Sequence, residues 1–96
     1  MQLKIGNIYW LTPEGNIPHP CVIVELNNDN TVKVCAITTN KKKINMPGIV
    51  VLEAGEGNLP KQSIVEVYKE FKISKDQLND FIGSLNQKRI EEILKG

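Results

Sequence analysis

Residues 21–38, CVIVELNNDNTVKVCAIT, decide the fold of this chain. Residues 21–26 form a nearly continuous apolar run, which predicts a strand buried on both faces. The four residues NNDN at 27–30 suit a tight turn, because Asn and Asp tolerate left-handed backbone conformations. Residues 31–38 are again rich in apolar and β-branched side chains. The stretch therefore predicts a β-hairpin with strands at 21–26 and 31–38.

Shorter strand-like segments lie on either side of this hairpin. GNIYWL at 6–11 predicts a first strand, and the three prolines and one glycine of TPEGNIPHP at 12–20 predict a loop. After the hairpin, we expect a polar, basic loop at 39–47, a strand at 48–53, a second loop at 54–61 and a strand at 63–71.

The hydrophobic period changes near the C-terminus. Ser74 and Gln77 have the S-x-x-Q form of a capping box. Three apolar residues follow at helical spacing, namely Leu78, Phe81 and Ile82. We predict a helix here that packs into the core and stops at Gly83. Asn86 is expected to cap a last helix, whose charged side chains, Arg89 among them, would form a solvated face.

These segments predict a mainly β fold with a C-terminal helix. About five strands without a helix between them favour a small barrel over a βαβ sheet. The 96 residues suit a single domain spanning 1–96. No apolar run approaches the roughly 18 residues of a membrane span, and the N-terminus lacks a signal-peptide core. We therefore expect a cytoplasmic protein with no membrane partner.

Cysteine, histidine and charge content narrow the kind of site. Cys21 and Cys35 lie in apolar runs, which favours buried thiols over a disulfide. A single histidine and no C-x-x-C motif argue against zinc, so we expect no metal and no cofactor. The net charge of +1 argues against binding of duplex DNA by bulk charge alone, but not against a local basic groove.

Residues 31–47 carry such a local charge, with four lysines and no acidic residue. The second strand of the hairpin runs into two hydroxyls, Thr38 and Thr39, and then into three lysines, Lys41, Lys42 and Lys43. Hydroxyl and ammonium groups that converge at a strand end suit a phosphodiester. The alternatives are a strand end without function and a solvated lysine loop.

Six short motifs, in order along the chain, resemble the PemK/MazF-type toxin family of toxin–antitoxin endoribonucleases. Residues 6–10, GNIYW, resemble the family's G-D-I-Y-W opening, and HPCVIV at 19–24 resembles its R-P-x-V-V-V strand. VCAITT at 34–39 resembles V-x-P-I-T-S. The remaining three matches are residues 47–52, residues 63–65 with 73–78, and IGSL at 82–85.

This resemblance implies an SH3-like barrel, a homodimer, a groove for single-stranded RNA, and a cognate antitoxin peptide that occupies the same groove. The family's catalytic hydroxyl maps onto Thr38, and its catalytic arginine maps onto His19. The residues then expected to bind RNA are Asn16, Thr39, Asn40, Lys41, Lys42 and Lys43. The chain departs from the family at His19, at Asn7 in place of aspartate, and at Tyr68-Lys69 in place of Asp-Gln.

The replacement of arginine by His19 leaves three functions open. Histidine titrates near pH ~6.5 when unperturbed and can transfer protons, but it supplies less fixed charge than arginine. The first function is a metal-independent endoribonuclease toxin that cleaves single-stranded RNA. The second is a non-catalytic module of the same fold that binds RNA or protein. The third is an SH3-like module that binds peptides and no nucleic acid.

Overall fold

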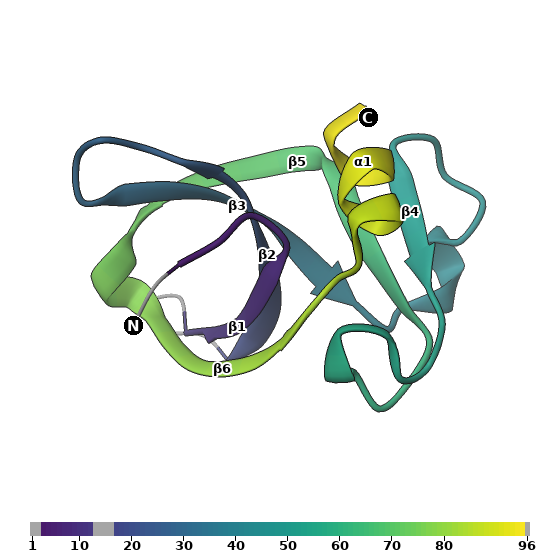
Figure 1. Ribbon diagram of the computed structural model, residues 1–96. Helices are drawn as coiled ribbons and strands as arrows, with labels where there is room; N and C mark the ends of the chain where they lie inside the picture. Colours follow the sequence, from purple (N-terminus) through teal and green to yellow (C-terminus); the bar gives the residue numbers. More distant parts are fainter. Residues whose placement is uncertain (1–2, 13–16, 96) are drawn as a thin grey trace.

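In the computed structural model of the protein, the described residues are 3–12 and 17–95. They form six strands, three short 3-10 helices and one α-helix (Figure 1). The strands are β1 (Asn7–Leu11), β2 (His19–Leu26), β3 (Thr31–Thr38), β4 (Ile49–Leu52), β5 (Ser63–Ser74) and β6 (Leu78–Ser84). The helices are η1 (Lys41–Lys43), η2 (Glu56–Asn58), η3 (Lys75–Gln77) and α1 (Gln87–Lys95).

All six strands belong to one antiparallel sheet in the order β4-β5-β3-β2-β1-β6. Figure 1 shows this sheet curling around itself, with α1 beside β4. The prediction of a mainly β fold with a C-terminal helix is confirmed, with six strands where the sequence predicts about five. β3 has the predicted bounds, and β2 starts two residues earlier than predicted, at His19.

The hairpin that decides the fold buries both of its faces. Val22 and Val24 belong to the larger core cluster, which α1 helps to cover, whereas Cys21 and Ile23 belong to a second cluster around Tyr9. Alternate side chains of one strand therefore serve two cores, which is why the apolar run at 21–24 is continuous rather than alternating.

The prediction of a helix after Ser74 is wrong. Ser74 and Gln77 do form the capping box, but it begins only the single turn η3, and residues 78–84 continue as strand β6. β6 pairs with the edge of β1 that β2 leaves uncovered. Pairing with β1 stabilises residues 78–84 as a strand more than their local pattern favours a helix.

The apolar residues of β6 also differ from the predicted core stripe. Leu78 and Ile82 are partly buried and pack against different clusters. Phe81 is 52% exposed, with its ring 5.5 Å from that of Tyr9 in an edge-on arrangement. The strand thus uses these side chains on two faces, whereas a helix would have placed them together on one.

Gly83 allows β6 to lie directly on the η2 loop. A Cβ atom at Gly83 would come within 2.2 Å of the carbonyl oxygen of Gly57. Only glycine permits this close backbone approach, so Gly83 marks a packing contact rather than the end of a helix.

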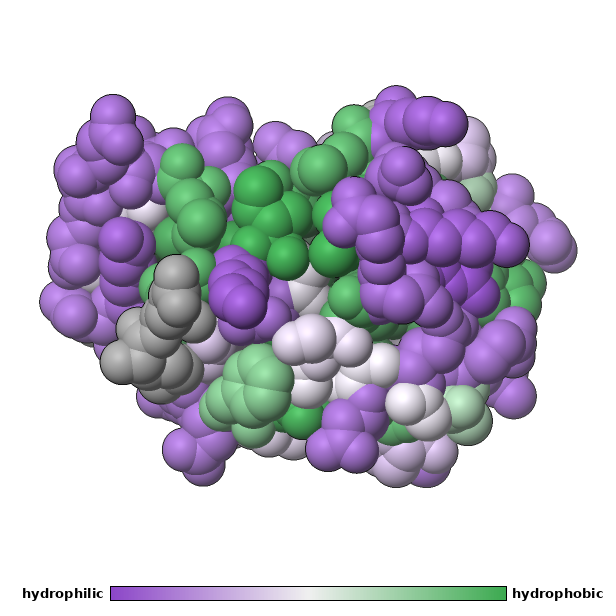
Figure 2. Space-filling model, in the orientation of Figure 1, coloured by the Kyte–Doolittle hydropathy of each residue, from purple (hydrophilic) through white to green (hydrophobic). Residues whose placement is uncertain are grey.

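The last helix is present as predicted. Asn86 caps it, since its side-chain Oδ1 accepts the backbone N–H of Arg89 at 2.9 Å. Within residues 3–12 and 17–95, no helix has both the length and the apolar character that crossing a membrane requires. Figure 2 shows apolar side chains gathered in the middle of the face that Figure 1 presents, between two hydrophilic flanks.

Candidate active site

His19 and Thr38, 19 positions apart in sequence, line the same pocket of about 370 Å³. β2 and β3 pair with Cys21 opposite Ala36, and extending this register by two residues places His19 opposite Thr38. The hairpin therefore brings the two predicted catalytic residues together at one end of its strands. The other lining residues are Trp10, Pro20, Ile37, Thr39, Leu59, Pro60, Lys61, Ser63 and Ile82.

The hydroxyl of Thr38 has a defined role in the local hydrogen bonding. Its Oγ1 accepts the backbone N–H of Asn40 at 3.1 Å. The side chain of Asn40 in turn caps η1, with Oδ1 accepting the N–H of Lys42 at 3.1 Å. Because Oγ1 acts as an acceptor within the chain, its proton is left for donation to a ligand.

The lysines of η1 do not all face the same way. Lys41 and Lys42 are exposed, together with Thr39 and Asn40. Lys43 turns inward, and its Nζ lies 2.8 Å from Oε2 of Glu66 in β5. The basic loop at 39–47 therefore presents two ammonium groups to solvent, while the charge of the third is balanced internally.

Glu66 is a buried carboxyl group, with 7% of its surface exposed. Burial alone would raise its pKa, but hydrogen bonds from Lys43 and from the Tyr68 hydroxyl, the latter at 2.6 Å, outweigh burial and lower it. The same contacts raise the pKa values of Lys43 and Tyr68. The Glu66 carboxylate therefore stays ionised at neutral pH and is a fixed negative charge beside the loop.

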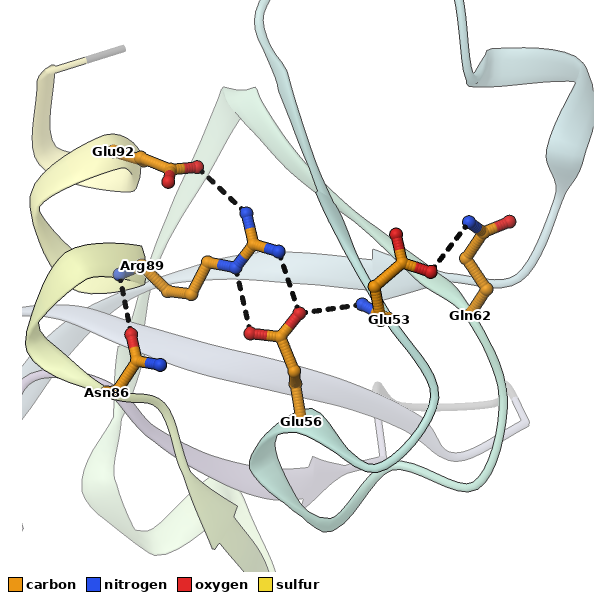
Figure 3. A network of polar contacts seen from close by, with 6 residues as sticks. All are labelled: Glu53, Glu56, Gln62, Asn86, Arg89 and Glu92. Atoms are coloured by element: carbon orange, nitrogen blue, oxygen red, sulfur yellow. Dashed lines mark hydrogen bonds and ion pairs between the residues drawn. The ribbon is translucent and has the colours of Figure 1, made fainter.

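One wall of the pocket is held by α1. This wall consists of Leu59, Pro60, Lys61 and Ser63, which follow η2. Arg89 of α1 donates two hydrogen bonds of 2.8 Å to the carboxylate of Glu56 in η2, and it also donates to Glu92. Figure 3 shows these contacts. Arg89 is thus an anchor between helix and loop, and its predicted place on a solvated face is wrong.

A second, apolar pocket of about 330 Å³ adjoins the first, and His19 and Pro20 line both. Cys21, Phe71 and Lys72 are also among its lining residues. The prediction of two buried thiols is confirmed, since Cys21 and Cys35 are both buried and unbonded. No group of three or more His, Cys, Asp or Glu residues within the described chain could hold a metal ion.

The sequence predictions cover part of this site. His19, Thr38, Thr39 and the exposed Asn40 lie at or beside one pocket, whereas Asn16 is outside the described residues. The sequence analysis missed Glu66, whose signal was a lone acid within the apolar run at 64–67. Trp10 is 41% exposed and lines the pocket.

Comparison with known families agrees with this arrangement. A model of the PemK-like, MazF-like toxins of type II toxin–antitoxin systems matches residues 4–96. The chain belongs to this family. The resemblance drawn from six short motifs is thereby confirmed.

Related sequences and structures agree with membership of the PemK/MazF family. The chain is 29% identical to endoribonuclease MazF2 of Mycobacterium bovis and to endoribonuclease MazF6 of Mycobacterium tuberculosis, over all of its own length and 94% of theirs. A solved endoribonuclease in complex with its cognate antitoxin, from a mycobacterial species, has the same fold, with a TM-score of 0.79 at 19% identity. That match covers 98% of this chain and 88% of the other.

Proposed function

We propose that this chain is the endoribonuclease toxin of a type II toxin–antitoxin pair and cleaves single-stranded RNA without a metal ion. The observation that carries this proposal is the shared pocket of His19 and Thr38, in a chain that belongs to the PemK/MazF family. The related mycobacterial proteins carry the name endoribonuclease, which agrees with it. On this proposal residues 1–96 form one toxin domain, which acts in the cytoplasm.

The chemistry is attack of an RNA 2′-oxygen on the adjacent phosphorus. A base must take the 2′ proton, an acid must protonate the departing 5′-oxygen, and donors must stabilise the charge on phosphorus-bound oxygens. On this proposal the neutral imidazole of His19 takes the 2′ proton and returns it to the 5′-oxygen. Thr38 donates its hydroxyl proton to a non-bridging oxygen, which its acceptor role toward Asn40 supports.

Positive charge for the RNA backbone comes from the exposed Lys41 and Lys42, with Lys61 at the pocket wall. Thr39 and Asn40 add polar groups beside the phosphate, and Asn16 remains a proposed contact. Trp10 offers an exposed ring on which a base can stack.

The direct test is cleavage of single-stranded RNA by the purified protein in EDTA, across about pH 5–8, where histidine changes its charge. We expect cleavage by the natural sequence and its loss in His19→Ala. Intact RNA throughout, with His19→Ala indistinguishable from the natural protein, would rule out the proposed activity.

The presence of His19 where the family has arginine favours one second candidate, a non-catalytic module that binds RNA or protein. Salt-sensitive RNA binding without cleavage products would support this module. Restoring the arginine with His19→Arg would then produce cleavage, because guanidinium supplies a fixed charge and a planar fork for phosphate.

The proposed partners are a cognate antitoxin peptide and a second copy of the chain. The solved structural neighbour is an endoribonuclease bound to its antitoxin, and this chain shares its fold. Several large apolar side chains are exposed, including Ile5 and Leu94, which line one shallow depression beside α1. Light scattering would test the homodimer, and a neighbouring gene for a short acidic protein would support the antitoxin.

A further inference from the structure

Glu66 is a buried acid within the apolar run at 64–67 of β5. Its neighbours in β5, Val65 and Val67, belong to the larger core cluster. A buried carboxylate is costly unless it is paired, and pairing here comes from Lys43 at 2.8 Å and Tyr68 at 2.6 Å. Lys43 lies within the basic loop at 39–47, and Tyr68 contacts Gly48, the residue directly after that loop.

A chain of hydrogen bonds leads from this carboxylate to the candidate catalytic hydroxyl. Glu66 holds Lys43, the last residue of η1. The first turn of η1 is capped by Asn40, whose own N–H donates to Thr38 Oγ1. The contact of Glu66 with Lys43 therefore holds η1 in place. A fixed η1 in turn holds the Asn40 N–H against the acceptor side of the Thr38 hydroxyl.

The far end of the loop is seated on the same stretch of β5. The backbone N–H of Tyr68 donates to the carbonyl oxygen of Gly48 at 2.9 Å. A Cβ atom at Gly48, where φ is +76°, would come within 2.9 Å of Tyr68 Cβ. The middle of the loop thus rests on Glu66 through Lys43, and Gly48, directly after the loop, rests on Tyr68; Glu66 and Tyr68 share one hydrogen bond.

The backbone of β5 is itself irregular at this point. β3 and β5 pair with Cys35 opposite Glu70 and then with Ile37 opposite Val65. Residues 66–69 therefore face the single residue Ala36, which makes a bulge. A bulge redirects side chains, and this one lies where β5 holds the loop.

We propose that Glu66 is a positioning residue of the RNA-cleaving site, which acts through Lys43 to orient the Thr38 hydroxyl. This positioning role rests on the proposed function. It also means that the three lysines of η1 have two different roles. Lys43 is the internal counter-ion that holds the loop. Lys41 and Lys42 are the lysines that contact RNA phosphates.

The division of tasks is tested by comparing Lys43→Met with Lys42→Met, which remove the same charge from adjacent positions. Lys42→Met is expected to flatten the dependence of log affinity on log salt by about 0.7 for single-stranded RNA, because one phosphate contact is lost. Lys43→Met is expected to leave the salt slope unchanged and to lower kcat about 10- to 100-fold, because a donor is displaced. The same response in both variants would overturn the proposal.

Rescue and a measurement without RNA complete the test. The exchanged pair Lys43→Glu with Glu66→Lys is expected to recover most of the kcat that either single change loses. Amide hydrogen exchange at Asn40 and Lys42 is expected to become faster in Lys43→Met and in Glu66→Gln, but not in Lys42→Met. Unchanged exchange in Lys43→Met and Glu66→Gln would overturn the positioning role.

The exchange measurement also separates this inference from the proposed function. An inactive natural protein would overturn the proposed activity, and with it the catalytic part of the positioning role. The hold of Glu66 on the loop is judged by amide exchange alone, whether or not RNA is cleaved.

Discussion

The site depends, at the scale of single residues, on the direction of one hydroxyl. Thr38 Oγ1 accepts a backbone N–H from Asn40, and this contact leaves the hydroxyl proton available to a ligand in the pocket that Thr38 lines. A strand-end threonine is common, but this one is followed by a capped turn that fixes its acceptor role. The arrangement makes the hydroxyl a donor, which is what a charged phosphate oxygen requires.

Thr38→Ala is expected to lower the rate of RNA cleavage about 10²- to 10³-fold, the usual cost of losing a donor to a developing negative charge. The free energy of unfolding should fall by no more than about 1 kcal/mol, because the lost hydrogen bond is at the surface. Thr38→Ser keeps the hydroxyl and serves as the control. Thermal unfolding of Thr38→Ala should be measured together with cleavage. A large fall in Tm that accompanies the loss of activity would show that Thr38 has a structural role instead.

The two thiols are expected to be unreactive in the folded protein. Burial raises the pKa of Cys21 to about 12 and that of Cys35 to about 11, so neither forms a thiolate at neutral pH. A thiol-reactive dye should label neither residue in the native state and both in guanidinium chloride. Rapid labelling of the native protein would show that the β2–β3 hairpin opens locally.

Sequence reasoning reaches some of these residues and not others. Thr38 was first found as a hydroxyl at a strand end beside lysines, His19 was found through the family resemblance, and the hairpin register explains their proximity. Glu66 was missed because its partner Lys43 lies 23 positions away, across a loop whose course no local pattern predicts.

Among the elements, α1 and η2 form one unit through a single guanidinium. Arg89 makes two hydrogen bonds to Glu56, and Glu56 also accepts the backbone N–H of Glu53. Gln62, next to the pocket wall, donates to Glu53 (Figure 3). The C-terminal helix therefore stabilises a loop that borders the candidate active site.

Arg89→Met is expected to lower the free energy of unfolding by about 1 kcal/mol, a discounted value for a partly exposed ion pair. The loop at 53–62 should become more mobile, because Glu56 loses its two contacts to the helix. Lys88→Met removes the neighbouring exposed charge and is the control. Urea denaturation of the two variants measures the difference, and equal stabilities would mean that the bidentate contact adds nothing.

The elements also show where pattern reading succeeds and fails. The β2–β3 hairpin was predicted closely, because its apolar runs and its Asn-rich turn are local signals that agree with the final fold. β6 was predicted as a helix because the sequence at Ser74 and Gln77 has the form of a capping box. The box does form, but it begins only the single turn η3. The pairing of β6 with β1 is a contact between distant segments, and a local pattern carries no information about it.

For the molecule as a whole, acid is expected to destabilise the fold. Hydrogen bonds from Arg89 lower the pKa of Glu56, and hydrogen bonds from Lys43 and Tyr68 outweigh burial to lower that of Glu66. In acid the unfolded chain therefore binds more protons than the folded chain. The stability that these groups contribute is complete above the ordinary carboxyl pKa of about 4 and is lost as the pH falls through their lowered values.

Urea denaturation at a series of acidic pH values measures this loss. Glu56→Gln should reduce the slope of unfolding free energy against pH in acid, because one of the groups with a lowered pKa is removed. Stability that rises as the pH falls below about 4 would contradict the assignment.

The antiparallel pairing of β1 with β6 joins the two ends of the chain. Asn7 lies opposite Ser84, and the Ser84 hydroxyl donates to Asn7 Oδ1 at 2.8 Å. Ile82 of β6 also lines the pocket of His19 and Thr38. A ribosome delivers β6 after every other strand, so an incomplete nascent chain has one edge of β1 unpaired and lacks the part of the pocket that Ile82 lines. The pocket of His19 and Thr38 is therefore complete only once the chain has been synthesised through β6.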